Sequence, residues 1–115
     1  MKSMHLFLVT ALAISTSSLV RAHAFLDHAE PRVGSTVAAP AQLELWMTED
    51  LEPAFTEVQV FDSQGHEVDK KDAKISGATM IVALPKLGSG TYLVKWKAVA
   101  TDTHKTTGTF KFTVQ

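Results

Sequence analysis

The sequence predicts an all-β fold, either a sandwich or a barrel, built as a single domain. Short runs of β-forming residues alternate apolar and polar side chains, and clusters of turn residues separate these runs. Neither a long amphipathic helical stretch nor a repeat or low-complexity tract occurs in the sequence. A chain of 115 residues has room for one domain.

Three strands are expected in the first part of the domain. Gln42–Met47 alternates, with its apolar side chains on one face. Glu57–Phe61 follows the same pattern and leads into turn residues at Asp62–Gly65. Thr79–Leu84 is a compact apolar run bounded by a glycine and a proline. Strands of this length and spacing are typical of two-layer β-proteins.

The last two strands are the most clearly patterned. Gly90–Val99 and Thr107–Val114 each place their larger apolar side chains on one face. Tyr92, near the start of the first of them, resembles a tyrosine corner, in which the phenol hydroxyl bonds nearby backbone. The polar segment Ala100–Thr106 is therefore expected to be a loop on two firm strands, where binding groups are often found.

Residues 1–22 have the features of an export signal. Lys2 gives a positive start, and Leu6–Ile14 is apolar but shorter than the roughly 20 residues that a membrane span needs. A Ser/Thr segment follows, and Val20–Ala22 supplies residues that a signal peptidase accepts. We therefore expect a cleaved signal peptide at 1–22 and an exported mature domain at 23–115.

A second cut is compatible with the same segment. Ala22-His23-Ala24 itself forms an A-x-A pattern, and cleavage after Ala24 would leave Phe25 first. Only cleavage after Ala22 leaves a histidine, His23, at the N-terminus. The residues of the segment leave both cuts open.

The composition of the mature domain narrows the function classes. Loss of Lys2 and Arg21 leaves nine of the 11 basic and all 12 acidic side chains, a net charge of −3. This balance argues against nucleic acid, which proteins bind by neutralising phosphates with Lys and Arg, and it suits a domain that holds a cation. The chain has no cysteine, so disulfides and thiolate metal sites are excluded.

Three residues form the candidate metal site. An N-terminal His23 offers two nitrogen donors that are neutral near neutral pH, its α-amine and its imidazole. His104 adds a third nitrogen from the polar loop, and Asp102 beside it either supplies an oxygen or orients a ligand. Three nitrogens and one oxygen suit Cu(II), which also heads the affinity order of the divalent first-row metals. We therefore expect one Cu(II) per monomer at this site.

Four further residues are weaker candidates for metal ligands. His28 is either a ligand or a solvated residue leading into Pro31, and Glu49 is either an exposed loop acid or a group near the metal. Met47 and Met80 lie in predicted strands, in phase with apolar neighbours. We expect both methionines in the core rather than as thioether ligands.

Three stretches of the mature chain carry a recognisable pattern. They are the opening His23-Ala-Phe-Leu…Pro31-x-x-Gly-Ser35, the pair Ala39-Pro40 with Thr48-Glu49-Asp-Leu51 after the next strand, and the ending Gly90-Thr-Tyr92-x-Val94-x-Trp96-x-Ala98-Val99-x-x-Asp102-Thr-His104-x-x-x-Gly108-x-x-x-Phe112-x-Val114. In these stretches the chain resembles the CopC/YobA family of exported copper-binding proteins, and the likeness runs over nearly its whole length.

The resemblance implies a seven-stranded Greek-key β-barrel of the cupredoxin-like or Ig-like kind. It also implies a Cu(II) site made by the N-terminal histidine and by the aspartate and histidine of a D-x-H motif, which here are His23, Asp102 and His104. Glu49 matches a glutamate near that site in some members. Because mature members begin with histidine, the resemblance favours the cut after Ala22.

Two departures from the family pattern bear on the metal. Some members bind Cu(I) in a methionine-rich loop, but the corresponding region here, Phe61 to Ala73, contains no methionine. Many relatives begin His-x-His, whereas Phe25 stands at the third position of this chain, and whether His28 replaces that histidine stays open. We therefore expect a protein that binds Cu(II) only.

The expected function is that of a periplasmic copper carrier or buffer in copper homeostasis or resistance, and not that of an enzyme. The resemblance implies a role in copper tolerance or uptake, with a copper-handling inner-membrane protein of the CopD type as partner. The mature domain is expected to be free of the membrane and of nucleic acid.

Two alternatives follow from the same residues. Lytic polysaccharide monooxygenases also hold copper with an N-terminal histidine and a second histidine on a β-sandwich, but this chain is short for one and shows no aromatic-rich platform. The other alternative is an Ig-like structural module with incidental histidines. Oxidative cleavage of chitin or cellulose would revive the first, and failure to bind Cu(II) would favour the second.

Overall fold

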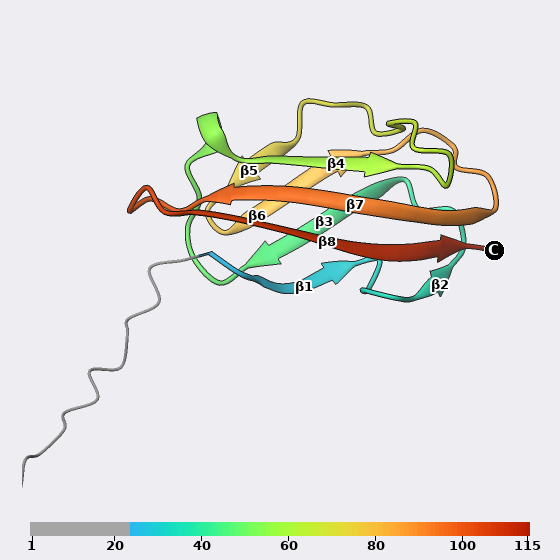
Figure 1. The fold of residues 1–115 in the computed structure, drawn as a ribbon, viewed down its shortest axis with the longest axis horizontal. Coiled ribbons are helices and arrows are strands. Elements are labelled where there is room, and N and C mark those ends of the chain that lie inside the picture. The colour runs from blue at the N-terminus through green and yellow to red at the C-terminus, as the bar shows by residue number, and fades with distance from the viewer. Residues whose placement is uncertain (1–23) are drawn as a thin grey trace, which may run out of the picture.

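The computed structural model describes residues 24–115, which form two four-stranded β-sheets (Figure 1). The first sheet has the order β1-β3-β6-β5, with bounds Leu26–Glu30, Gln42–Met47, Thr79–Ala83 and Lys74–Ser76. The second has the order β2-β8-β7-β4, with bounds Thr36–Val37, Lys105–Val114, Gly90–Val99 and Glu57–Phe61. A 3₁₀ turn, η1 at Pro53–Phe55, lies between β3 and β4. The all-β prediction is confirmed, and the predicted signal peptide lies outside the described residues.

The alternation of the strands builds one hydrophobic core between the two sheets. In β3 every second side chain is buried, and β4, β6 and β7 repeat the same pattern. The largest fully buried side chains are Phe112, Leu43, Leu45, Met80, Val60, Val82 and Val94. Met47 and Met80 are 5% and 0% exposed, so their prediction as core residues is confirmed.

The polar loop between the last two strands is shorter than predicted. β8 begins at Lys105 and not at Thr107, because Lys105 pairs with Val99 and Thr106 with Ala98 in the β7–β8 ladder. The two strands therefore extend almost to the tip of the hairpin, and this rigid ribbon carries the candidate metal ligands.

The described residues contain eight strands rather than about seven, and their ladders form two separate sheets. The fold is therefore a sandwich and not a closed barrel; the Greek-key topology stays a prediction. Three of the eight strands, β1, β2 and β5, were not predicted individually, because their sequence signals are weak. A bulge between Leu26 and His28 breaks the alternation of β1, and β2 and β5 contain only two and three residues.

Two close contacts stabilise strands β7 and β8, which form the hairpin. The hydroxyl of Tyr92 donates a hydrogen bond of 2.7 Å to the carbonyl of Gly88, which confirms the tyrosine corner. In β8, Gly108 lies directly under the indole of Trp96, so closely that a Cβ atom there would be 2.3 Å from the ring. Glycine is required at this position because the aromatic ring occupies the space of a side chain.

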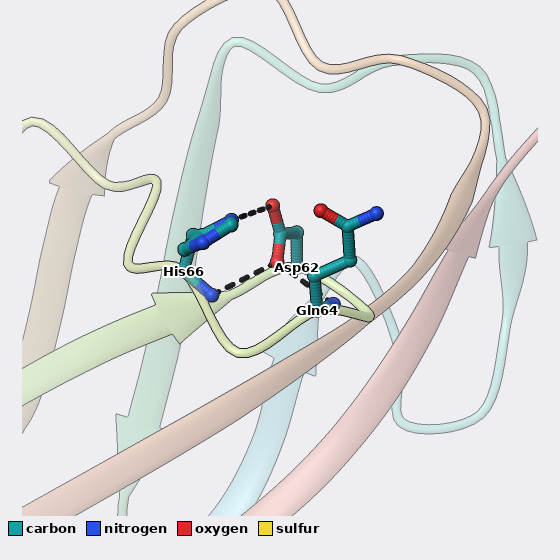
Figure 2. Close-up of polar contacts among 3 residues, drawn as sticks. All are labelled: Asp62, Gln64 and His66. Atoms are coloured by element: carbon teal, nitrogen blue, oxygen red, sulfur yellow. Dashed lines mark hydrogen bonds and ion pairs between the residues drawn. The ribbon is translucent and has the colours of Figure 1, made fainter.

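A turn centred on a carboxylate lies at the other end of the sandwich, where β4 ends. One oxygen of Asp62 accepts the backbone N–H groups of Gln64 and His66, each at 2.9 Å, and the other lies 3.5 Å from the His66 ring (Figure 2). The hydrogen bond from the His66 backbone is the main cause that lowers the pKa of Asp62. The His66 side chain is 73% exposed, as expected for a loop histidine.

A second carboxylate organises the segment that follows this turn. Asp69 is buried, and its two oxygens accept the backbone N–H groups of Val60 at 2.8 Å and Lys71 at 3.2 Å. The Asp69 side chain thereby satisfies the Val60 N–H at the edge of β4, beside the backbone bond of 2.8 Å from the Val68 N–H to the Val60 carbonyl. Backbone hydrogen bonds to carboxylates thus hold the region from Phe61 to Ala73 in shape.

Candidate metal centre

The tip of the β7–β8 hairpin presents Asp102 and His104. The N–H of Thr103 donates to the Ala100 carbonyl at 2.8 Å, and the N–H of Ala100 donates to the His104 carbonyl at 3.0 Å. Thr103 has a φ of 77°, in the left-handed region that ends a three-residue hairpin loop of this kind. The loop is therefore a defined turn that fixes the positions of the two candidate ligands.

Asp102 contacts His104 through both carboxylate oxygens. Oδ1 accepts the backbone N–H of His104 at 3.2 Å, and Oδ2 lies 3.1 Å from the ring nitrogen Nδ1. Both side chains are accessible, at 39% and 55% exposure for Asp102 and His104. A carboxylate at Nδ1 is the usual second partner of a histidine that binds metal through Nε2, because it fixes the tautomer and orients the ring.

Three chain segments meet at this end of the sandwich. The Thr106 hydroxyl donates to the carbonyl of Ala24, which joins the start of the described chain to β8. Phe25 and Thr48 exchange two hydrogen bonds, from the Phe25 N–H to the Thr48 hydroxyl at 2.9 Å and from the Thr48 N–H to the Phe25 carbonyl at 2.8 Å.

The third connection joins the loop after β3 to the hairpin. The N–H of Thr101 donates to the Asp50 carbonyl at 3.1 Å, and Leu51 and Ala100 form an isolated antiparallel bridge. Hydrogen bonds therefore link residues 24–25, 48–51 and 100–106 to one another. Figure 1 shows the start of β1 and the β7–β8 hairpin at the same end of the molecule, away from the C-terminus.

The predicted site residues fall in different places relative to this end. Asp102 and His104 are brought into contact, and Glu49 is exposed in the adjoining loop, between Thr48 and Asp50. His23 lies outside the described residues. Within residues 24–115, no group of three or more His, Asp or Glu side chains could hold a metal ion, so the predicted three-residue set depends on His23.

His28 has partners of its own on the outer face of β1. Its ring stacks on the indole of Trp46, with centroids 4.4 Å apart and planes 9° from parallel. Its Nδ1 is 2.6 Å from the carboxylate of Asp27, the neighbouring residue. Trp46 is half-buried beneath this ring. Nothing in these contacts joins His28 to Asp102 or His104, and its part in metal binding stays a prediction.

Sequence reasoning missed the two threonines that tie the start of the chain to the site. Thr48 stands in the family motif after β3, but a threonine there does not indicate which residue it will bond, and Thr106 falls in the predicted loop.

Among the described residues, no helix is long and apolar enough to cross a membrane.

The comparison with protein families gives one domain match. Residues 26–115 match the CopC domain. Copper resistance protein C of Pseudomonas syringae pv. tomato is 34% identical over 114 residues, which cover 91% of this chain and 90% of that protein. Protein YobA of Escherichia coli K12 is 36% identical over 114 residues, which cover 91% and 92%.

One relative is much longer than this chain. The copper transport protein CutJ of Bacillus subtilis strain 168 is 33% identical over 98 residues, which cover 81% of this chain and 18% of CutJ.

Solved structures share the fold. The crystal structure of CopC from Methylosinus trichosporium OB3b has a TM-score of 0.72 and 32% identity, covering 81% of this chain and 94% of that one. PcoC from Escherichia coli, described as a methionine-rich copper resistance protein, has a TM-score of 0.72 and 31% identity, covering 81% and 99%.

Proposed function

Because this chain belongs to the CopC family, we propose that its mature form is a periplasmic carrier or buffer for one Cu(II) ion in copper resistance or homeostasis. It is a binding protein and not an enzyme in this proposal. The names of its relatives, which refer to copper resistance and copper transport, support this class of function.

The proposed site combines the N-terminus with the hairpin. His23 supplies its α-amine and imidazole after cleavage behind Ala22, and His104 supplies Nε2. The contact between the Asp102 carboxylate and Nδ1 of His104 supports an orienting role for Asp102 over direct ligation. Bound Cu(II) would be held by nitrogen donors, and its affinity should fall as pH drops because those nitrogens take up protons.

The proposed site is selective for the oxidised ion. Met47 and Met80 are buried in the core, and the region from Phe61 to Ala73 is built on aspartates and has no methionine. Thioether sulfur is the side-chain donor that favours Cu(I) in the absence of cysteine. Reduction of the bound ion should therefore loosen it, which suits a carrier that releases copper.

The proposed acceptor or donor of copper is an inner-membrane protein of the CopD type. A segment similar to this chain makes up 18% of CutJ, a protein named for copper transport. In that relative the similar segment is part of a much longer chain named for copper transport, which supports a second copper-handling protein as partner of the separate domain.

The contact between Asp102 and His104 carries the proposal, and a titration tests it. The exported protein is first weighed by mass spectrometry to establish whether it begins at His23. That protein is then titrated with Cu(II) against a moderate chelator, beside a matched protein with one glycine added before His23. We expect one tightly bound Cu(II) in the first and affinity lower by orders of magnitude in the second. Equal affinity of the two proteins would refute the N-terminal site.

A further inference from the structure

Two threonines hold the backbone of Ala24 and Phe25 at the candidate metal centre. The Thr106 hydroxyl donates to the Ala24 carbonyl, and the Thr48 hydroxyl accepts the Phe25 N–H at 2.9 Å. The Thr48 backbone N–H also donates to the Phe25 carbonyl at 2.8 Å, which continues the β1–β3 pairing one residue beyond Leu26. We name these contacts the threonine clamp.

The residues held by the clamp are packed as well as hydrogen-bonded. Ala24 is 0% exposed and belongs to the hydrophobic core, although it precedes the first strand. A buried carbonyl needs a hydrogen-bond partner, and for Ala24 the partner is a side chain of β8. The clamp thus fixes the chain up to Ala24 through the fold itself.

The clamp also sets the distance between the two ends of the proposed copper site. Thr106 is two residues from His104 in the same hairpin, and Thr48 is next to Glu49. Consecutive Cα atoms are about 3.8 Å apart, so a residue joined to Ala24 starts from a point tied to the β7–β8 hairpin, which carries His104 at its tip. A ligand on that residue needs only its own few torsions fixed when it binds.

Resting on the proposed function, we propose that Thr106 and Thr48 are positioning residues that preorganise the N-terminal histidine for Cu(II). They do not touch the metal. They keep Ala24 and Phe25 in place in the metal-free protein, so that copper binding does not have to order these residues. The apparent dissociation constant rises in proportion as the fraction of molecules with a competent site falls.

Nearby threonines on β8 provide a matched control. Thr107 and Thr109 are exposed, and their positions alternate with that of Thr106, which is half-buried. A change of Thr107 to valine alters the same strand and residue type while leaving the clamp in place.

The experiment uses the mature protein beginning at His23, with the variants Thr106→Val, Thr106→Ser, Thr48→Val and Thr107→Val. The first measurement needs no copper: an aminopeptidase trims each metal-free protein, and mass spectrometry follows the loss of His23. Hydrogen exchange of the Phe25 amide is measured in parallel by NMR. The second measurement is Cu(II) affinity by chelator competition, and thermal unfolding verifies that each variant is folded.

We expect Thr106→Val to be trimmed and exchanged about tenfold faster and to bind Cu(II) about tenfold more weakly, since it leaves a buried carbonyl unsatisfied. Thr106→Ser should restore both values, Thr107→Val should match the native protein, and Thr48→Val should show the same direction of change. The Thr48 variant keeps the test open if Thr106→Val does not fold.

Two outcomes would overturn the clamp: unchanged trimming and affinity in both valine variants, or equal losses in Thr107→Val and Thr106→Val. Failure of the proposed function can be distinguished from failure of the clamp. In the first case the native protein itself would not bind Cu(II), while the metal-free measurements would still test the clamp.

Discussion

Asp102 holds His104 from two directions, with Oδ1 on its backbone N–H at 3.2 Å and Oδ2 beside its ring Nδ1 at 3.1 Å. One short side chain therefore fixes both the turn and the ring. The same relationship recurs at the other end of the sandwich, where Asp62 contacts the backbone N–H and the ring of His66. The two pairs differ in surroundings, since the first adjoins residues 24–25, where the described chain begins, and the second lies at the opposite end of the sandwich (Figure 1).

This recurrence gives a controlled test of the orienting role of Asp102. Asp102→Asn removes the carboxylate charge while keeping an oxygen acceptor for the His104 N–H. We expect Cu(II) affinity to fall about 10- to 100-fold, the usual effect of losing a carboxylate partner of a metal-binding histidine. Chelator competition measures the loss, and Asp62→Asn serves as the control that should leave affinity unchanged. Equal affinities in the two variants would remove Asp102 from the site.

Substitution of His104 separates the site from the fold. His104→Ala should weaken Cu(II) binding by orders of magnitude and leave the midpoint of thermal unfolding nearly unchanged, because the side chain is exposed in a loop. Competition titration and circular dichroism measure the two effects. His28→Ala is the comparison, and we expect it to retain affinity because its ring is engaged with Trp46 and Asp27. A loss as large as that of His104→Ala would make His28 a ligand.

Gly108 is predicted to be indispensable for packing. In Gly108→Ala the new methyl group would lie 2.3 Å from the Trp96 ring, so strands β7 and β8 would have to separate or the indole would have to move. Overpacking of this kind costs about 1–3 kcal/mol of unfolding free energy, which urea denaturation measures. Gly88→Ala is the control, since nothing lies within 4 Å of a Cβ atom at that position. Unfolding free energies that agree between the two variants would contradict the packing argument.

The turn at Asp62 should contribute to stability in a pH-dependent way. Backbone hydrogen bonds, first that of His66, lower the pKa of Asp62 in the folded protein below its ordinary value of 3.8. Its ionised form therefore stabilises the fold above that ordinary value, and this contribution is lost as pH falls through the lower pKa of the folded state. Urea denaturation between pH 2 and pH 6, compared with Asp62→Asn, measures it. A constant difference between the two proteins across this range would disprove the linkage.

The strands that were predicted well are those whose two faces differ most. Gln42–Met47 and Gly90–Val99 match the predicted bounds because one face of each is core and the other is solvent. β1 had no such signal, since its bulge turns Asp27 and His28 to the surface and leaves little alternation to detect. A period-of-two pattern reports burial, and a bulged edge strand buries too little to produce one.

The candidate site was predictable in its residues but not in its geometry. The two-residue spacing of Asp102 and His104 indicates that they are close, yet the contact with Nδ1 depends on the turn and on the positive φ of Thr103. The bond from Thr106 to Ala24 joins residues 82 positions apart. A hydrogen bond from a side-chain hydroxyl to a distant backbone carbonyl cannot be predicted from composition or residue spacing, so only the folded structure shows this bond.

The burial of Ala24 bears on how the protein is made. Cleavage after Ala22 leaves a single residue in front of an alanine that belongs to the core, whereas cleavage after Ala24 removes that alanine and the acceptor of the Thr106 hydroxyl. A chain cut after Ala24 would lack this core residue, and the Thr106 hydroxyl would lose its backbone acceptor. Of the two predicted cuts, the one after Ala22 is therefore the one that leaves the hydrophobic core and the Thr106 hydrogen bond whole.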